Sequence, residues 1–276
     1  MKFLELLKAV VLGIIEGITE WLPISSTGHM IILDEFLNLN VSPEFKEMFF
    51  VVIQLGAIAA VPVLFWNRLN PFTRKKSISE RRATFSLWGK VIVGVMPAAI
   101  LGLLLDDFFE EHLYNYVVVS IALIIYGILF ILVERMKKGR EYRVNDVSEL
   151  TYKDAVLIGA FQTLSLIPGT SRSGSTILGG MLSGVSRVAS AEFSFFMAIP
   201  VMLGASLLKV VKFLAEGFSA TGTEFLLLIV GIGVSFLVSL VSIKFLMDFV
   251  KRHSFSPFGV YRILLGTAVL IYFIAK

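Results

Sequence analysis

Two short segments of the chain combine side chains that can act on a phosphate group. The first, EGITEWLPISSTGH over residues 16–29, holds two glutamates, several hydroxyl residues and a histidine. The second, PGTSRSGST over residues 168–176, surrounds one arginine with glycines and hydroxyl residues. Carboxylates hold metal ions, hydroxyls attack electrophiles and histidine carries protons, whereas an arginine in a glycine-rich loop is typical of a phosphate site. Together the two segments predict phosphoryl chemistry.

Glu16 and Glu20 are four positions apart, so on a helix they would share one face. A carboxylate in such an apolar stretch is costly and indicates a function. Two on one face also repel each other, and a hard cation such as Mg²⁺ or Ca²⁺ would relieve both costs. We therefore expect Glu16 and Glu20 to bind a divalent cation. The competing interpretation puts both on a surface helix with His29 in a packing role, and the apolar surroundings disfavour it.

The residues after Pro23 are candidates for phosphate contacts and proton transfer. Pro23 is expected to break the helix. Ser25, Ser26 and Thr27 then supply hydroxyls on a flexible backbone. His29, one of only three histidines, can act as a general acid or base near neutral pH.

The second segment is predicted to bind phosphate through its backbone and its arginine. Gly169 and Gly174 allow backbone N–H groups to converge on an anion, and a helix starting near Ser173 would point its positive end at the same place. Arg172 adds a planar fork of donors that matches phosphate oxygens. Further donors are the hydroxyls of Thr170, Ser171 and Ser173. The alternative is a seam of small residues between membrane helices, but such a seam needs no arginine.

Composition indicates that these segments lie in a membrane protein. The chain is 56% hydrophobic and 17% charged, against about 45–50% and about 25% in soluble domains. The absence of cysteine excludes disulfides and thiolate metal sites. The sequence shows no clustered basic face, so nucleic acid is not a predicted partner.

Six apolar runs are long enough, or nearly so, to cross a bilayer. They are residues 48–66, 87–105, 113–133, 193–214, 225–243 and 256–275. Two further segments, about 1–40 and 152–190, are apolar but interrupted by polar residues, and we expect each to be a re-entrant helix–loop–helix element. Arg262, near the start of the last run, is expected to extend to a membrane interface.

Charges in the loops predict the orientation. Loops around 68–82, 135–143 and 247–257 are basic and should be cytoplasmic, whereas the acidic loop 106–112 should be outside. Both chain ends then face outward. His112 and His253 fall in loops on opposite sides and are not expected to join His29. Arg187 and Glu192 are expected to pair across a helix end in a structural role.

An internal repeat relates the two polar segments. An offset of 146 aligns Glu16 with Gln162 and Ser25 with Ser171. Each half, approximately 1–136 and 152–276, would contain one re-entrant element and three spans, so the second half enters the membrane from the opposite side. The expected fold is therefore a single all-α membrane domain with an inverted-topology repeat, and such folds place their site near the midplane.

The two motifs also resemble those of a known family. The pattern (E/Q)GxTE-x-LP-x-SS-x-GH paired with PGTSRSG is similar to the bacitracin-resistance type of undecaprenyl-diphosphatase, over essentially the whole chain. The resemblance implies hydrolysis of undecaprenyl pyrophosphate to undecaprenyl phosphate, which recycles the carrier lipid for cell-wall synthesis. It also implies a divalent cation, a bacterial plasma membrane and a site open to its outer face.

The same resemblance implies the roles of particular residues. Glu16, Glu20, Ser26, His29 and Arg172 would be catalytic, with Gly169–Gly174 as the phosphate loop. Ser26 would attack phosphorus or position the attacking water, and the sequence leaves both routes open. A homodimer is a further expectation that the sequence does not decide.

Three other functions remain to be weighed. A transporter or flippase of polyprenyl phosphate is the main alternative, because inverted repeats are frequent in transporters. It would need no nucleophile, so Ser26 with His29 favours an enzyme. An ion channel is disfavoured by paired carboxylates facing an arginine. Phosphatases of the phosphatidic-acid type need two motif histidines, and this chain offers one.

Overall fold

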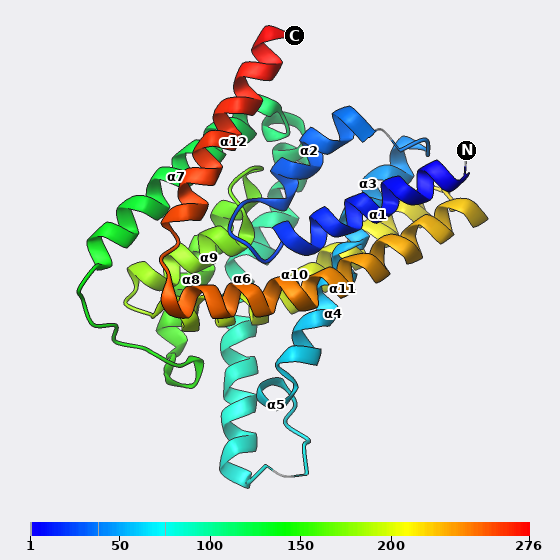
Figure 1. The fold of residues 1–276 in the computed structure, drawn as a ribbon. Coiled ribbons are helices and arrows are strands. Elements are labelled where there is room, and N and C mark those ends of the chain that lie inside the picture. Colours follow the sequence, from blue (N-terminus) through cyan, green and yellow to red (C-terminus); the bar gives the residue numbers. More distant parts are fainter. Residues whose placement is uncertain (1, 38, 75) are drawn as a thin grey trace.

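A computed structural model describes residues 2–37, 39–74 and 76–276, without the side chains of residues 106, 107, 110 and 111. Lys75, expected in the basic loop, lies outside the described residues. The described chain consists of helices joined by loops (Figure 1), and it also has an isolated bridge between Val144 and Val185. The α-helices are α1 (Lys2–Thr19), α2 (Ser26–Leu37), α3 (Pro43–Val52), α4 (Gln54–Leu64), α5 (Trp66–Leu69), α6 (Ile78–Leu113), α7 (Tyr116–Lys137), α8 (Tyr152–Thr163), α9 (Arg172–Leu182), α10 (Arg187–Ala215), α11 (Gly222–Arg252) and α12 (Ser256–Ala275). Two short 3₁₀ helices, η1 (Val147–Glu149) and η2 (Leu164–Leu166), complete the described helices.

The prediction of six spans is confirmed at the level of length and apolarity. Among the described residues, six helical segments are long and apolar enough to cross a membrane, and each contains most of one predicted run. The predicted loop at 106–112 is wrong, because α6 continues through it to Leu113. Acidic side chains do not stop a helix, and the turn instead falls at Tyr114 and Asn115, where Asn115 caps α7.

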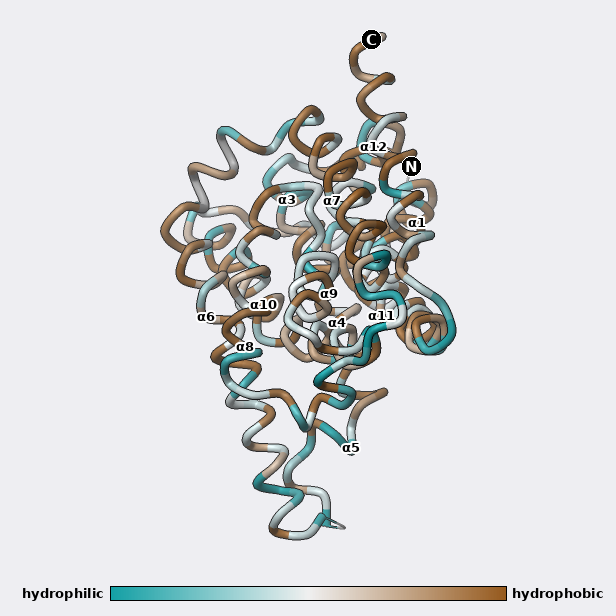
Figure 2. The backbone as a smooth tube through the Cα atoms, turned by 90° about the vertical axis from the view of Figure 1, so that its left-hand side faces the viewer, coloured by the Kyte–Doolittle hydropathy of each residue, from teal (hydrophilic) through white to brown (hydrophobic). Residues whose placement is uncertain are grey.

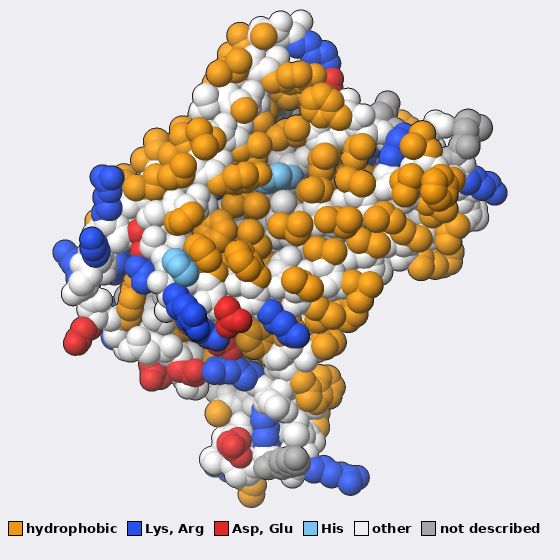
Figure 3. Space-filling view, in the orientation of Figure 1, with side chains coloured by type: hydrophobic (Ala, Val, Ile, Leu, Met, Phe, Trp, Pro, Cys, Tyr) orange, Lys and Arg blue, Asp and Glu red, His pale blue; other side chains and the backbone are white. Residues whose placement is uncertain are grey.

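Polar and apolar regions are separated on the molecule. Hydrophobic residues follow the long helices, while many hydrophilic stretches lie toward the end that carries α5 (Figure 2). On the face shown in Figure 3, charged side chains gather at the lower left and on the projecting lower part, and hydrophobic side chains cover much of the rest, with a few charged groups at the top and the right edge. The chain ends lie away from this charged part (Figure 1). The arrangement is that of a multi-pass membrane protein.

Close helix contacts at glycine hold the two polar segments in place. A Cβ added to Gly159 of α8 would lie 2.1 Å from the carbonyl oxygen of Gly94 in α6. A Cβ on Gly17 of α1 would lie 2.8 Å from the carbonyl oxygen of Ser235 in α11. Only glycine permits such approaches, so these contacts fix the helices that lead into both motifs.

The two halves share local features at the predicted offset. Helices α2 and α9 begin at Ser26 and Arg172, which are 146 positions apart. The preceding residues, Ser25 and Ser171, both have a positive φ, of 73° and 74°. Each of these serines also accepts a hydrogen bond from the glycine three residues later. The local correspondence agrees with an internal repeat, whose inverted orientation in a membrane stays a prediction.

Ion pairs connect separate segments at the charged end of the molecule, the part opposite the chain ends. Arg68 contacts Asp146 and Glu192, both at 2.9 Å, and Arg187 pairs with Glu134. The expected pair between Arg187 and Glu192 is therefore wrong. Residues five apart on a helix lie on different sides of it, and each finds a partner on another segment.

Arg262 also departs from expectation. Its side chain is fully buried, with 0% exposure, rather than extended to an interface. It begins near the start of α12, yet the side chain points into the protein toward both polar loops. Hydropathy cannot distinguish these two directions.

Candidate active site

The first loop leaves α1 in one further turn and then reverses. The amide of Glu20 still donates to the carbonyl of Glu16 at 3.1 Å, so the two carboxylates keep helical spacing. The chain turns over residues 20–24, and Ser25 adopts the left-handed conformation with φ 73°. A positive φ is strained for a non-glycine residue and is frequent at functional sites. Ser26 then starts α2.

The second loop repeats this construction. Gly169 has φ 89°, and a Cβ there would lie 2.6 Å from the carbonyl oxygen of Val119. Ser171 follows with φ 74° and caps α9, because its hydroxyl accepts a hydrogen bond from the amide of Gly174 at 3.1 Å. Arg172 is consequently the first residue of α9.

The two loops meet through Glu20. Its Oε1 accepts hydrogen bonds from Arg172 Nη2 at 3.0 Å and Nε at 3.3 Å. Its Oε2 accepts a hydrogen bond from Ser26 Oγ at 2.9 Å. The hydroxyl of Ser173 donates to the carbonyl of Glu20 at 3.1 Å, so a side chain of the second segment also holds the backbone of the first. A carboxylate, a hydroxyl and a guanidinium are thereby placed in one cluster.

Arg172 has a second anchor on α10. Its Nη1 donates to the carbonyl of Ser194 at 2.7 Å and to the hydroxyl of the same residue at 3.3 Å. The guanidinium also lies 6.0 Å from the ring centroid of Trp21. Only 9% of the Arg172 side chain is exposed. The orientation of its planar fork is therefore fixed on two sides.

A cavity of about 560 Å³ opens onto this cluster. The predicted residues in its wall are Glu20, Ser26, Thr27, Gly169, Ser171 and Arg172. Those outside its wall are Glu16, Ser25, His29, Thr170, Ser173 and Gly174. Apolar side chains of α6 and α10, including Leu103, Leu104 and Leu208, form another part of the wall. Leu103 and Leu104 are also 70% and 73% exposed. The cavity is therefore polar at the cluster and apolar along α6 and α10.

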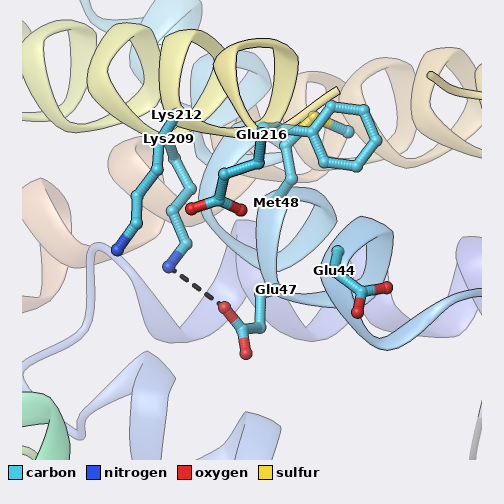
Figure 4. Close-up of a pocket in the computed structure, with 7 residues that line it drawn as sticks. Glu44, Glu47, Met48, Lys209, Lys212 and Glu216 are labelled. Atoms are coloured by element: carbon cyan, nitrogen blue, oxygen red, sulfur yellow. Dashed lines mark ion pairs between the residues drawn. The ribbon is translucent and has the colours of Figure 1, made fainter. Parts of the chain in front are cut away.

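Two lysines of α10 lie in the wall of the same cavity. Lys209 contacts Glu47 of α3 at 3.2 Å, and Lys212 extends beside it on the same side of the helix (Figure 4). Glu216 stands near them in a small neighbouring pocket. The lysines add positive charge to a cavity whose cluster already holds Arg172.

Glu16 is buried beside this cluster. It is 1% exposed, and Oε1 has no hydrogen-bond partner among the described residues. Glu16 is close enough to Glu20 and Arg172 to interact with both charges. No group of three or more metal-binding side chains is present in the described parts of the chain. Mg²⁺ however commonly takes only one or two carboxylates, with water and substrate phosphate as other ligands. The glutamates therefore fit a divalent cation.

His29 does not contact Ser26. Its Nδ1 lies 2.7 Å from the carbonyl oxygen of Ser25, and its Nε2 lies 2.7 Å from the hydroxyl of Tyr261. The two rings are stacked at 5.7 Å between centroids. A proton on Nδ1 would satisfy the carbonyl and leave Nε2 as the acceptor for Tyr261. In this arrangement the residue that contacts the Ser26 hydroxyl is Glu20.

Comparison with known proteins agrees with this geometry. A family model described as "Bacitracin resistance protein BacA" matches residues 9–268. The chain belongs to this family. It is similar to proteins named undecaprenyl-diphosphatase from Desulfitobacterium hafniense, with 56% identity over 100% of this chain and 99% of the relative, from Acetivibrio thermocellus, with 57% identity over 99% of both, and from Enterococcus faecalis, with 56% identity over 98% of both. The resemblance drawn from the two motifs is confirmed.

In this BacA-family chain, sequence reasoning missed several residues around the site. Gln54 lines the cavity where α4 begins, and Ser194 anchors Arg172. Tyr261 contacts His29, and Arg262 contacts both loops. A glutamine within an apolar span was a signal for Gln54. Ser194 and Tyr261 gave no signal, because serine and tyrosine are ordinary in membrane helices.

Proposed function

We propose that this protein hydrolyses undecaprenyl pyrophosphate to undecaprenyl phosphate and inorganic phosphate. It is a membrane-embedded phosphatase, and its activity recycles the carrier lipid used in cell-wall synthesis. The support comes from full-length relatives named undecaprenyl-diphosphatase and from a site suited to this chemistry. The family named for bacitracin resistance is consistent with the same substrate.

The observation that carries this proposal is the meeting of both motifs at Glu20. A phosphatase needs a nucleophile, an acceptor for its proton and fixed positive charge at the phosphoryl group. Ser26 and Arg172 contact the two different oxygens of Glu20. All three residues line one cavity, whose apolar walls suit a prenyl chain.

In the reaction, Ser26 Oγ forms a bond to the terminal phosphorus of the substrate. The bond from that phosphorus to the bridging oxygen breaks, and undecaprenyl phosphate leaves with the electron pair. Glu20 is positioned to take the serine proton, since it already accepts that hydrogen bond at 2.9 Å. Water then attacks the phosphorus of the phosphoserine, and the bond from phosphorus to Ser26 Oγ breaks. Glu20 returns its proton to Ser26 Oγ, and inorganic phosphate leaves with the two protons of the water.

Arg172 stabilises charge on the transferred phosphoryl group. Its guanidinium is held by Glu20 and Ser194 without substrate. When Glu20 becomes neutral on taking the proton, its attraction for Arg172 weakens. The guanidinium is then available to the phosphoryl oxygens at the moment when their charge develops. The backbone N–H groups of residues 169 and 171–173 are proposed to contribute in the same way. Those of Thr170 and Gly174 already donate to the Ile167 carbonyl and the Ser171 hydroxyl.

A divalent cation, Mg²⁺ or Ca²⁺, is part of the proposal. Glu16, through the oxygen that lacks a partner, and the neighbouring Glu20 would hold it. Such an ion would supply positive charge to the pyrophosphate oxygens. His29 would fix the turn at Ser25 through its hydrogen bond to that carbonyl.

We also propose the setting of the site. The protein spans a bacterial plasma membrane several times, with its basic loops in the cytoplasm, both chain ends outside and the cavity open to the outer face. The two halves are an inverted repeat of re-entrant elements. Support comes from the positive φ shared by Ser25 and Ser171, and from the charged end opposite the chain ends.

Phosphate release separates this function from its rival. Purified protein in detergent micelles is expected to convert undecaprenyl pyrophosphate to undecaprenyl phosphate with one inorganic phosphate per molecule. A transporter of polyprenyl phosphate would release none in micelles. Light scattering on the same preparation would detect a homodimer from its molecular mass. The phosphate-release test does not depend on the oligomeric state.

A further inference from the structure

Arg262 of α12 is the one fully buried arginine in the described part of the chain, and the proposed reaction does not use it. Its Nη2 donates to the carbonyls of Gly169 and Thr170 at 2.8 and 2.9 Å. Its Nη1 donates to the carbonyl of Pro23 at 3.1 Å, and its Nε to that of Leu123 at 3.5 Å. One side chain thus contacts the first loop, the second loop and α7.

The partners of Arg262 are neutral. No carboxylate interacts with its charge among the residues that the structure describes, and the ring of Tyr126 lies 5.5 Å from its guanidinium carbon. A buried charge without a counter-ion is costly, and packing alone would be served by an apolar side chain. A buried guanidinium that contacts two loops therefore indicates a role in holding those loops.

The position of the guanidinium explains that role. Both loops turn sharply just before a helix, and their carbonyls at 23, 169 and 170 point to the same place. A Cβ on Gly174 would lie 3.3 Å from Arg262 Nη1, so the arginine packs against the back of the phosphate loop. Only a planar fork with several donors spans these carbonyls, and a lysine has one nitrogen.

We propose that Arg262 is a positioning residue that sets the spacing between the two catalytic loops, and hence between Ser26 and Arg172. It holds the carbonyls of the second loop inward, which turns the N–H groups of the same peptides away from it. Its uncompensated charge also attracts a phosphate bound on the other side of the loop. Arg262 itself does not touch the substrate.

The test uses Arg262→Lys and Arg262→Met in the full-length purified protein. We expect kcat for phosphate release from undecaprenyl pyrophosphate to fall on the order of 10- to 100-fold while KM changes less than about threefold, because misplaced groups act mainly in the transition state. Backbone amides of residues 21–28 and 167–174 should exchange with deuterium faster in both variants. Arg187→Lys, at the Glu134 pair outside the cavity wall, is the matched control.

The outcomes separate positioning from stability. In the control, melting temperature should fall while kcat and loop exchange stay unchanged. Arg262 variants that melt lower but keep the wild-type kcat would overturn the proposal, as would unchanged loop exchange. If Arg262→Met does not fold, Arg262→Lys decides by the same measurements. The kcat measurement rests on the proposed function. Wild-type protein without turnover would refute that function, and the deuterium-exchange measurement would still test the role of Arg262.

Discussion

Arg172 Nη2 lies 3.0 Å from Oε1 of Glu20, although the two residues are 152 positions apart in the chain. Their side chains are 9% and 5% exposed. Burying either charge without the other would destabilise the fold, so each requires the other until substrate binds. The pair is therefore both a structural link between the motifs and the charge arrangement that a phosphoryl group would meet.

Separating this pair should affect stability and activity differently. Arg172→Ala and Glu20→Gln are each expected to lower kcat by about 10²–10³, a loss typical for removal of a transition-state contact. Each should also destabilise the fold, by up to about 3–5 kcal/mol for Arg172→Ala, because a buried charge loses its partner. The double variant should recover part of the stability and none of the activity. Melting temperature and phosphate release measure the two effects.

Normal turnover in either single variant would contradict the site. Arg187→Ala provides the comparison, since it breaks the pair with Glu134 outside the cavity. That variant should lose stability and keep kcat.

Ser26 should carry the phosphoryl group during turnover. Substrate labelled in its terminal phosphate and quenched with acid is expected to leave labelled phosphoserine at residue 26, identified by mass spectrometry. Ser26→Ala should show no label and should lose about 10²-fold or more in kcat, as expected for a lost covalent route. Ser165→Ala removes another hydroxyl of the cavity wall and should keep the label at Ser26. Retained turnover in Ser26→Ala would exclude the serine route.

The spans and the meeting of the motifs could be predicted because they rest on local or unavoidable physics. Twenty apolar residues cross a bilayer whatever their neighbours are, and the guanidinium of Arg172 needs an anionic partner in an apolar interior. The length of α6 could not be predicted, since acidic residues permit either a helix or a loop. Its continuation to Leu113 depends on where Asn115 caps the next helix.

The directions in which individual side chains point also could not be predicted from the sequence. An arginine near the end of a span can extend outward or point inward, and Arg262 points inward because that face of α12 meets the two loops. His29 likewise follows Ser26 closely in sequence, yet it contacts Tyr261. Both outcomes depend on the packing of α12, which lies more than 200 residues after the first loop in the chain.

Glu16 should control the affinity for a divalent cation. Glu16→Gln is expected to weaken Mg²⁺ binding at least on the order of 10–100-fold, the range seen even for lost outer-shell contacts. Calorimetry on chelator-treated protein without substrate measures this binding, and a Mg²⁺ titration of turnover gives the kinetic counterpart. Gln162→Ala, at the equivalent position of the second half, should leave the binding constant unchanged. Equal affinity in wild type and Glu16→Gln would remove Glu16 from the metal site.

Gly159 should be intolerant of any side chain. Its added methyl would lie 2.1 Å from the carbonyl oxygen of Gly94, a backbone atom that cannot move without shifting α6. Gly159→Ala is expected to destabilise the protein by about 1–3 kcal/mol through overpacking. Gly204→Ala is the matched control, because nothing lies within 4 Å of its Cβ position. Thermal unfolding in detergent compares the two, and equal melting temperatures would show that α8 does not pack as described.

Asp146 should make the charged end of the protein sensitive to acid. Its hydrogen bonds with Arg68 lower the pKa of this carboxyl from 3.8 to about 2. A depressed pKa means that the stabilisation is present above pH 3.8 and is lost as the pH falls through about 2. The side chain is 42% exposed, so solvent screening limits the effect to about 1 kcal/mol or less. The melting temperature of Asp146→Asn should therefore lie below that of wild type at pH 6, and the difference should shrink between pH 4 and about 2. A difference that stays constant over this range would mean that the charge of Asp146 does not stabilise the loop.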